Sequence, residues 1–442
     1  MWTLKVENYA KIDSAQITLA PFTMFIGDNN SGKSYIMTLI YGLLTTRFRN
    51  FIIDETSDIY KECCKSIQLE EISNEKEFSE LEFTKFVQLL NEVLNLNKSV
   101  FLRQLFNKEV EIGKLEVDIS YIEGFSIKYI EMDVINNIGL ILAYVSNEPK
   151  ELEIYNWTTT IKDGMTLNYL EIIKYILHSI LKCVNGKFIS IPAYFPTSRT
   201  GFMLTFKKIV ETSLAENFGL WQENNNITLL TKPCIDFLSS ISTLSKNKKI
   251  EKYKDIVEFI DNYIIDGSIE YNDLPVADIH YVPAGSDNKE GIPLHVSSGV
   301  VTELAPLSLY LKYKEFDMLM MEEPEMCLHP YLQWQMTRVL IQLMHMENHV
   351  LITTHSDTIL QHINNMIKMN VDDIEQLKEY GYSEKDKISP QQIKVYQFNS
   401  KKNHKTQIQE LECTVNGFVA PTFNDTLIRM LKEAKSFEIT EE

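Results

Sequence analysis

The sequence predicts a mixed α/β fold in which a parallel sheet carries a phosphate-binding loop. The first observation is FIGDNNSGKS at residues 25–34, where an apolar strand runs through a glycine-rich turn into a helix. The second is the alternation of apolar strands and amphipathic helices at 316–362, which is typical of parallel sheets. The third is a set of short alternating runs at 115–160, which indicates an additional antiparallel meander.

The spacing of apolar residues predicts the other elements in chain order. Three- and four-residue spacing indicates helices, and strict alternation indicates strands. We expect strands at 2–8 and 15–26, helices at 33–44, 50–112 and 166–183, a strand at 187–199, helices within 200–265, a hairpin at 269–296, a helix at 300–314, a second hairpin at 393–412 and a last helix after Pro421.

Composition limits the classes of partner. The 442 residues carry a formal net charge of −18, which disfavours general attraction to nucleic acid and leaves room only for a local basic groove, for example at 244–254 or 400–407. The six cysteines show no zinc-ligand spacing, as expected of thiols in a reducing cytosol. We expect no signal peptide and no membrane span, since the most apolar stretch, 135–145, is too short to cross a bilayer. These features predict a cytoplasmic protein.

The spacing Gly27-x-x-x-x-Gly32-Lys33-Ser34 is the P-loop pattern. The glycines let successive backbone N–H groups face phosphates, and the following helix directs its positive end at them. Lys33 is expected to reach the β- and γ-phosphates, and the Ser34 hydroxyl to bind Mg²⁺. The residues predicted to bind ATP here are Gly27, Asn29, Asn30, Ser31, Gly32, Lys33 and Ser34.

A pair of acids, Glu322 and Glu323, ends the apolar strand FDMLMM. In P-loop enzymes an acid at such a position holds the metal, and a second carboxylate polarises the attacking water. Taken alone, two acids at a strand end are also typical of a solvated turn. With the P-loop upstream, we expect the pair to be functional.

The segment MEEPEMCLHP at 321–330 resembles the Walker B motif and D-loop of ABC-type ATPases, in the branch that contains the RecF, SMC and OLD proteins. The resemblance implies an α/β ABC-ATPase head, a mixed P-loop sheet plus an antiparallel β lobe, with helical insertions. It places Glu322 on the metal and makes Glu323 the catalytic base. The usual metal-side acid is Asp, so the longer Glu322 is either absorbed by a backbone shift or slows hydrolysis, because Mg²⁺ demands tight geometry.

Two further motifs follow the same resemblance. HVSSGVVTELAPL at 295–307 is similar to the ABC signature, with Ser297, Ser298 and Gly299 opening a helix. VLITTHSDTIL at 350–360 resembles the switch strand, with His355 as the residue that senses the γ-phosphate.

The resemblance covers about 1–45, 187–200 and 280–440, and it leaves the Q-loop unplaced. Tyr9 or Lys11 is a candidate for the adenine contact, and Arg199 is a candidate neighbour of the site. We expect four segments: 1–48, the N-terminal part of the ATPase head; 49–186, a helical insertion and antiparallel meander; 187–268, a strand and helical lobe; and 269–442, the C-terminal part of the head.

In ABC-type ATPases the signature completes the ATP site of the opposite subunit, so the resemblance implies a homodimer or larger homo-oligomer with ATP at its interface. The middle segments lack sustained heptads, which excludes the long arms of SMC proteins. Fewer than 90 residues follow His355 and they contain no Asp-x-Asp, so we expect no Toprim nuclease of the OLD type in this chain.

Three hypotheses remain open. The first is an ATPase that acts as sensor or scaffold for a separate effector, a nuclease or toxin, in bacterial anti-phage defence. The second is a RecF-like DNA-repair ATPase that clamps duplex DNA. The third, suggested by Glu322, is a protein that binds ATP but barely hydrolyses it.

Overall fold

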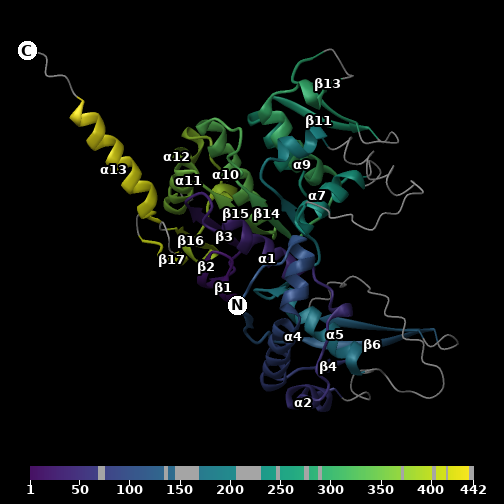
Figure 1. Cartoon of the computed structure of the whole chain (residues 1–442). Helices are drawn as coiled ribbons and strands as arrows, with labels where there is room; N and C mark the ends of the chain where they lie inside the picture. The colour runs from purple at the N-terminus through teal and green to yellow at the C-terminus, as the bar shows by residue number, and fades with distance from the viewer. Residues whose placement is uncertain are drawn as a thin grey trace, which may run out of the picture. The chain divides into compact units, whose positions relative to one another are not determined.

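Figure 1 shows a computed structural model of the chain. It describes residues 1–67, 75–133, 138–144, 169–205, 230–244, 249–272, 278–286, 291–369, 373–400, 405–414 and 417–437. The chain forms two compact units, each assembled from separated segments. Unit 1 comprises Met1–Leu19, Thr38–Pro192 and Leu229–Lys232, and unit 2 comprises Ala20–Met37, Ala193–Thr228 and Pro233–Glu442.

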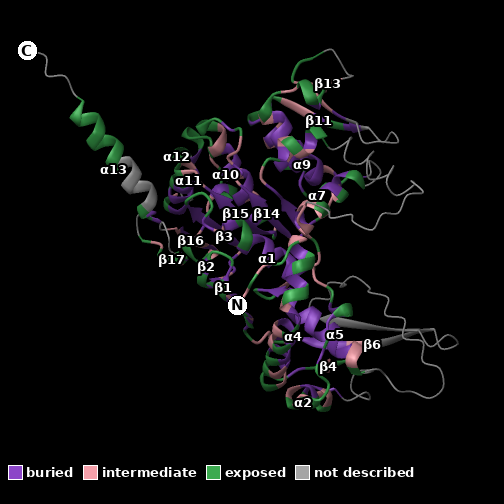
Figure 2. Cartoon of the chain, in the orientation of Figure 1, coloured by how far each residue is buried: buried purple, intermediate pink, exposed green. Residues whose placement is uncertain are grey.

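Unit 2 is built on a mixed sheet whose strands run in the order β10-β14-β15-β3-β16-β17. Their bounds are β3 (Phe22–Gly27), β10 (Pro192–Phe195), β14 (Met318–Glu322), β15 (His349–Thr354), β16 (Ile393–Asn399) and β17 (Thr406–Leu411). The pairs β14–β15, β15–β3 and β3–β16 are parallel, and β16–β17 is antiparallel. Every residue of β3, β14 and β15 is buried, as expected for strands covered on both faces (Figure 2).

The helices of unit 2 alternate with these strands as the sequence predicts. They are the first turn of α1 (Lys33–Thr45), α7 (Lys232–Ser242), α8 (Lys254–Tyr263), α9 (Gly299–Tyr313), α10 (Pro330–His345), α11 (Asp357–Lys368), α12 (Ile374–Glu379) and α13 (Pro421–Ser436). A separate antiparallel sheet joins β11 (Gly267–Asn272), β12 (Asp278–Pro283) and β13 (Ile292–Pro293). Helix α10 packs on α8, α11 and β15, and α8 packs on α9.

Unit 1 contains three sets of antiparallel strands, one of them a short pair at 183–188, and a long helix. The strands β2 (Ile12–Thr18), β1 (Trp2–Tyr9) and β5 (Lys114–Ile119) pair in that order, and β4 (Lys76–Glu77), β6 (Ser126–Asp133) and β7 (Ile138–Tyr144) form the second sheet. The helices are α2 (Asp58–Ser66), α4 (Glu80–Phe106) and α5 (Tyr169–Lys182), followed by the short strands β8 (Cys183–Val184) and β9 (Lys187–Phe188). The Asn91 amide donates to the Val117 carbonyl at 3.0 Å and accepts from its N–H at 2.8 Å, which fixes α4 on β5.

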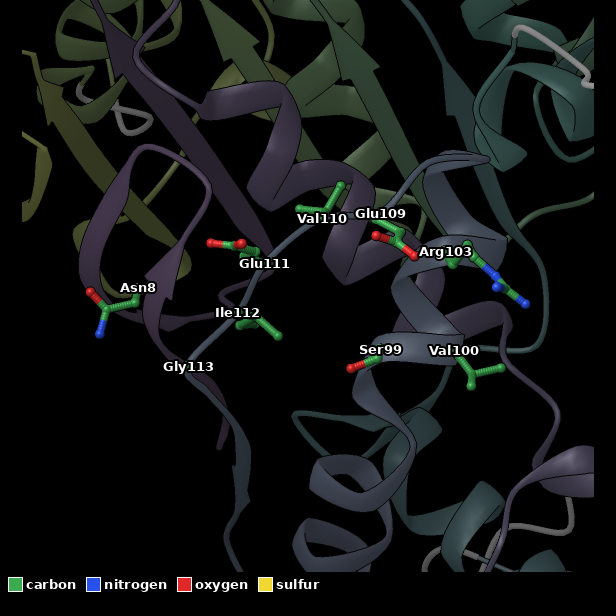
Figure 3. Close-up of a pocket in the computed structure, with 9 residues that line it drawn as sticks. All are labelled: Asn8, Ser99, Val100, Arg103, Glu109, Val110, Glu111, Ile112 and Gly113. Carbon is green, nitrogen blue, oxygen red and sulfur yellow. The ribbon is translucent and has the colours of Figure 1, made fainter.

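A cavity of about 620 Å³ opens in unit 1 (Figure 3). It is lined by Asn8 near the end of β1, by Ser99 and Arg103 of α4, and by residues 109–113. The β1–β2 turn itself is tight, with Asn8 and Ala10 at φ of 51° and 49°.

The structure departs from the sequence-based elements in four places. The helical segment expected at 50–112 is interrupted by the short strand β4, and the strand expected at 187–199 is two short strands, β9 and β10. The strand expected at 15–26 is two strands, β2 and β3, because Pro21 has no N–H for a ladder and the Ala20 N–H instead bonds the Thr23 hydroxyl at 2.9 Å. The meander expected at 115–160 is also divided, since β5 pairs with β1 whereas β6 pairs with β4 and β7. Some predicted segments lie outside the described residues. They are the part of the meander beyond 144, the expected helical segment 206–229 and parts of both basic stretches.

Within the ranges given above, no helix is both long enough and apolar enough to cross a bilayer.

Candidate functional site

The predicted phosphate loop joins β3 to α1 at the carboxyl end of the parallel strands, where ligands bind in open α/β sheets. Gly27 ends β3 with φ of 129°, and a Cβ built there would lie 2.3 Å from the carbonyl oxygen of Phe398 on β16. Asn30 and Gly32 also have positive φ, 60° and 99°. The close approach of β16 and the turns of the loop therefore explain why this position holds glycine.

Lys33 begins α1 and folds back over the loop. Its Nζ donates to the carbonyl oxygens of Gly27 at 2.9 Å and Asp28 at 2.8 Å, and lies 3.4 Å from Ser31 Oγ. Only 5% of the residue is exposed. Burial lowers the pKa of Lys33 to about 8, although the charges of Glu323 and Asp28 oppose the shift. The loop thus holds a desolvated ammonium group beside a helix N-terminus, which suits a polyphosphate.

Glu322, the last residue of β14, is buried among donors from the β10 segment. Its Oε1 accepts a short hydrogen bond from the Tyr194 hydroxyl, and its Oε2 lies 3.4 Å from the Thr197 N–H. In the sheet, Glu322 is paired with Thr353 of β15, which is in turn paired with Phe25 of β3. One strand, β15, therefore lies between the predicted metal-side acid and the strand that leads into the phosphate loop.

Glu323 follows in a left-handed conformation, with φ of 44°. Its N–H donates to the Thr353 carbonyl at 2.8 Å, and its Oε1 lies 3.7 Å from Nε2 of His355. Burial, aided by the charge of Lys33, lowers the pKa of His355, so the imidazole is neutral near pH 7. A non-glycine residue at positive φ costs free energy, and such strain is frequent where a side chain must be aimed at a reacting group.

Glu325 holds His355, the predicted switch residue, in place. Its Oε1 accepts the His355 N–H at 2.7 Å, and burial raises the pKa of its carboxyl group. The predicted D-loop thus contributes an acid that orients His355 within the same chain.

The predicted signature begins α9 as expected. Ser298 is the N-cap, and its hydroxyl accepts the Val301 N–H at 3.4 Å. Ser298 and Gly299 are exposed, and a Cβ built on Gly299 would lie 3.5 Å from Sγ of Cys327 in the D-loop. The hydrogen bond of the Ser297 hydroxyl is local, to the Pro293 carbonyl at 3.2 Å. The start of α9 is therefore exposed and lies beside the predicted D-loop of the same chain.

The structure brings most of the predicted site residues together. The charges of Glu322, Glu323 and Glu325 act on Lys33, and His355 interacts with Lys33, Glu323 and the backbone of Gly27. Within the loop, Ser31 is buried whereas Asn29, Asn30 and Ser34 are exposed.

Tyr9 cannot present its ring to an adenine base, because the residue is fully buried in unit 1. Lys11, the other candidate, is exposed in the β1–β2 turn of unit 1. That adenine assignment is therefore wrong for Tyr9.

The protein groups fit Mg²⁺ that arrives with a nucleotide. Within the described residues, no group of three or more His, Cys, Asp and Glu side chains is arranged to hold a metal ion. Mg²⁺ characteristically uses one or two protein ligands together with substrate phosphates and water. The Ser34 hydroxyl is exposed on the first turn of α1, and the Glu322 carboxylate keeps further lone pairs beyond its two donors.

Sequence comparison places the chain in a family. Residues 1–360 match the AAA ATPase domain. The chain belongs to the AAA ATPase domain family. This AAA ATPase is therefore an ATP-binding P-loop ATPase. No curated protein matches it significantly.

Solved structures similar to this AAA ATPase include SMC heads. One is an Smc head bound to the C-terminal winged-helix domain of ScpA, at 13% identity and a TM-score of 0.38, covering 93% of this chain and 97% of that one. The Smc head of Pyrococcus furiosus bound to the C-terminal domain of ScpA has 12% identity and a TM-score of 0.38, covering 98% and 100%. The SMC head of Thermotoga maritima has 11% identity and a TM-score of 0.33, covering 93% and 98%.

Sequence reasoning missed several residues that shape the site. Tyr194 and Thr197 hold Glu322, Glu303 of α9 pairs with Arg199, and Glu325 holds His355. Of these, only Glu325 carried a signal, as the third acid of MEEPE. Arg199, the candidate neighbour, does reach the Walker B segment.

Proposed function

We propose that this AAA ATPase closes as a homodimer around ATP and acts as a cytoplasmic sensor or scaffold for a separate effector protein. The observation that supports a dimer is the exposure of the N-terminus of α9. Ser298 and Gly299 are exposed there, and Ser298 is already the cap of its own helix. A capped helix end with free N–H groups attracts an anion. The γ-phosphate held on the P-loop of a second copy is an anion of the right kind.

Each chain supplies the remaining half of the site. Lys33 and the loop N–H groups bind the β- and γ-phosphates, Glu323 accepts a proton from the attacking water, and neutral His355 donates a hydrogen bond to the γ-phosphate. Ser34 and Glu322 would hold Mg²⁺ together with the phosphates, and the bound ion would supply positive charge to the transferring phosphoryl group. ATP binding then favours the closed dimer, and hydrolysis releases it.

We further propose that hydrolysis is slow. The support is the environment of Glu322, whose two carboxylate oxygens already accept from the Tyr194 hydroxyl and the Thr197 N–H. Each donor takes one lone pair and draws negative charge from the carboxylate, which leaves Glu322 a weaker ligand for the metal or for its bound water. A slow step would lengthen the life of the closed dimer, as suits a switch.

The effector hypothesis is supported by the content of unit 1. Its helices α2 and α4 and the sheet β4-β6-β7 supply none of the predicted ATP-site residues and form a separate body of structure. We propose that this part contacts the effector, a nuclease or toxin, and that the pair serves in anti-phage defence. Deleting the gene should then raise phage sensitivity, and pull-down at native expression should recover the effector.

The proposed dimer is tested by measuring the molecular mass of the protein in solution with and without Mg·ATP. Glu323→Gln should bind ATP, hydrolyse it very slowly and double its mass in light scattering. Ser298→Asp is the matched variant, since Asp caps a helix as well as Ser but places a negative charge against the phosphate. It should keep ATP binding and stay monomeric when combined with Glu323→Gln. A monomer for Glu323→Gln with ATP bound would contradict the proposal, and salt-sensitive, ATP-dependent binding of duplex DNA would favour the RecF-like clamp.

A further inference from the structure

Arg199 sits in a buried junction between the Walker B strand and the signature helix. It follows β10 in the segment FPTSR, and only 1% of it is exposed. One guanidinium nitrogen donates to the carbonyl oxygen of Glu322 and, at 3.1 Å, to that of Pro196. The other donates to the carbonyl oxygen of Glu323 at 3.0 Å. The side chain therefore holds the two peptide units that flank the Cα of Glu323, the predicted catalytic base.

The same guanidinium is paired with the signature helix. Its second terminal nitrogen lies 2.7 Å from Oε1 of Glu303, and both side chains are 1% exposed. The other Glu303 oxygen accepts from the N–H of Thr200 at 2.9 Å and from its hydroxyl at 2.7 Å. Glu303 lies five residues after Ser298 in α9, about 7.5 Å along a helix of standard rise. A shift of the α9 N-terminus is thus transmitted to Glu303 as a rigid displacement.

The junction contributes a specific geometry more than net stability. A buried ion pair loses much of its attraction to the desolvation of its charges, and apolar groups of similar volume often fill such a place equally well. An apolar pair, however, could not bond the two carbonyl groups beside Glu323. What the Arg199–Glu303 pair adds is a short, charged connection from α9 to the backbone of Glu323.

We propose that Arg199 is a positioning residue that couples the two ATP sites of the dimer. The inference rests on the proposed function, in which α9 of one copy completes the ATP site of the other. When the second copy's γ-phosphate engages Ser298, α9 moves, Glu303 carries Arg199 with it, and the peptide of Glu323 is set in its catalytic orientation. ATP bound at the site that α9 completes therefore controls hydrolysis at the other site, whose Glu323 belongs to the same chain as that α9.

The test replaces the pair without leaving a buried charge. Arg199→Met with Glu303→Gln keeps an acceptor for Thr200 and removes the connection to the carbonyl groups. Arg338→Met with Asp386→Asn is the matched control, because it removes another buried pair of unit 2, at 3.0 Å, that contacts neither α9 nor β14. For each protein we would measure ATP affinity, ATP-dependent mass, kcat, and the Hill coefficient of the rate against ATP concentration.

Wild-type protein should give a Hill coefficient above 1. The Arg199–Glu303 double variant should bind ATP and dimerise normally, lose its cooperativity, and fall in kcat by about 100-fold, the scale expected when a catalytic group is misplaced by about 1 Å. The Arg338–Asp386 control should keep the wild-type kcat and Hill coefficient. A double variant with the kcat and Hill coefficient of wild type would overturn the inference, as would an equal loss in the control.

Folding and the proposed function are checked separately. If urea denaturation shows that the double variant is not folded, Arg199→Lys replaces it. Lysine keeps the ion pair, but its single ammonium has three donors for the four acceptors that the two guanidinium nitrogens of Arg199 bond. The same loss of cooperativity is expected, and its absence counts against the inference. Wild-type protein that never dimerises with ATP would refute the proposed function and this coupling with it, whereas normal dimers with an unaffected variant refute the coupling alone.

Discussion

The buried Lys33 predicts that ATP binding takes up a proton at mildly alkaline pH. Its pKa of about 8 means that the ammonium and neutral amine are equally populated near pH 8 in the free protein. The phosphates favour the charged form, so binding must protonate the neutral fraction. From this pKa, uptake is about 0.1 proton at pH 7, about 0.5 at pH 8 and about 0.9 at pH 9.

The fraction of charged Lys33 at each pH also determines how the affinity for ATP changes with pH. The sign follows from the lowered pKa: the competent, charged form is full below pH 7 and is lost as the pH rises through 8. ATP should therefore bind about 10-fold more weakly at pH 9 than at pH 7, a difference of about 1.4 kcal/mol. Titration calorimetry in two buffers with different ionisation enthalpies measures the uptake directly. Lys33→Arg is the matched control, because arginine stays charged throughout and should take up no proton at this position.

Equal heats in the two buffers at pH 8, for wild type as for Lys33→Arg, would refute the reasoning. That result would mean that Lys33 is fully charged in the free protein and that burial does not lower its pKa.

Three other changes test the local geometry. Tyr194→Phe removes a buried donor from Glu322 and should lower the free energy of unfolding by about 1.5–3 kcal/mol, whereas the same change at the half-exposed Tyr331 should alter it by less than about 0.5 kcal/mol. Gly27→Ala places a Cβ 2.3 Å from a backbone oxygen and should lower the free energy of unfolding by more than about 1 kcal/mol. Alanine at Gly201, where a Cβ meets nothing within 4 Å, should be tolerated. Urea denaturation measures the stability of all four variants. Glu322→Asp, with the usual metal-side acid, should raise kcat several-fold in a phosphate-release assay, and an unchanged or lower rate would contradict slow hydrolysis by Glu322.

The elements that hold the nucleotide machinery could be predicted because their signals are local. The spacing from Gly27 to Lys33 lies within one turn and one helix start, and it appears in the structure as β3, loop and α1. The Ser298 cap is likewise a short-range hydrogen bond to Val301. The alternation at 316–362 appears as β14, α10, β15 and α11, with parallel strands.

The partners of these residues could not be predicted, because they depend on the order of strands in space. Tyr194 reaches Glu322 across 128 positions of sequence, only because β10 lies beside β14. Arg199 meets Glu303 for a similar reason, and a buried arginine gives no periodic signal. The pairing of β5 with β1 was missed because alternation predicts a strand but not its neighbour.

The central claim, that each ATP site is shared by two copies, is tested most directly by mixing two inactive chains. Lys33→Met should lose ATP binding while keeping its signature helix, and Ser298→Asp should bind ATP but fail to complete a neighbour's site. In a mixed dimer the nucleotide on the Ser298→Asp chain meets the intact α9 of the Lys33→Met chain. The account predicts that the mixture forms ATP-dependent mixed dimers, seen when a tag on one chain recovers the other, although neither chain dimerises alone. Dimers of Ser298→Asp by itself, or a mixture that stays monomeric in ATP, would contradict it.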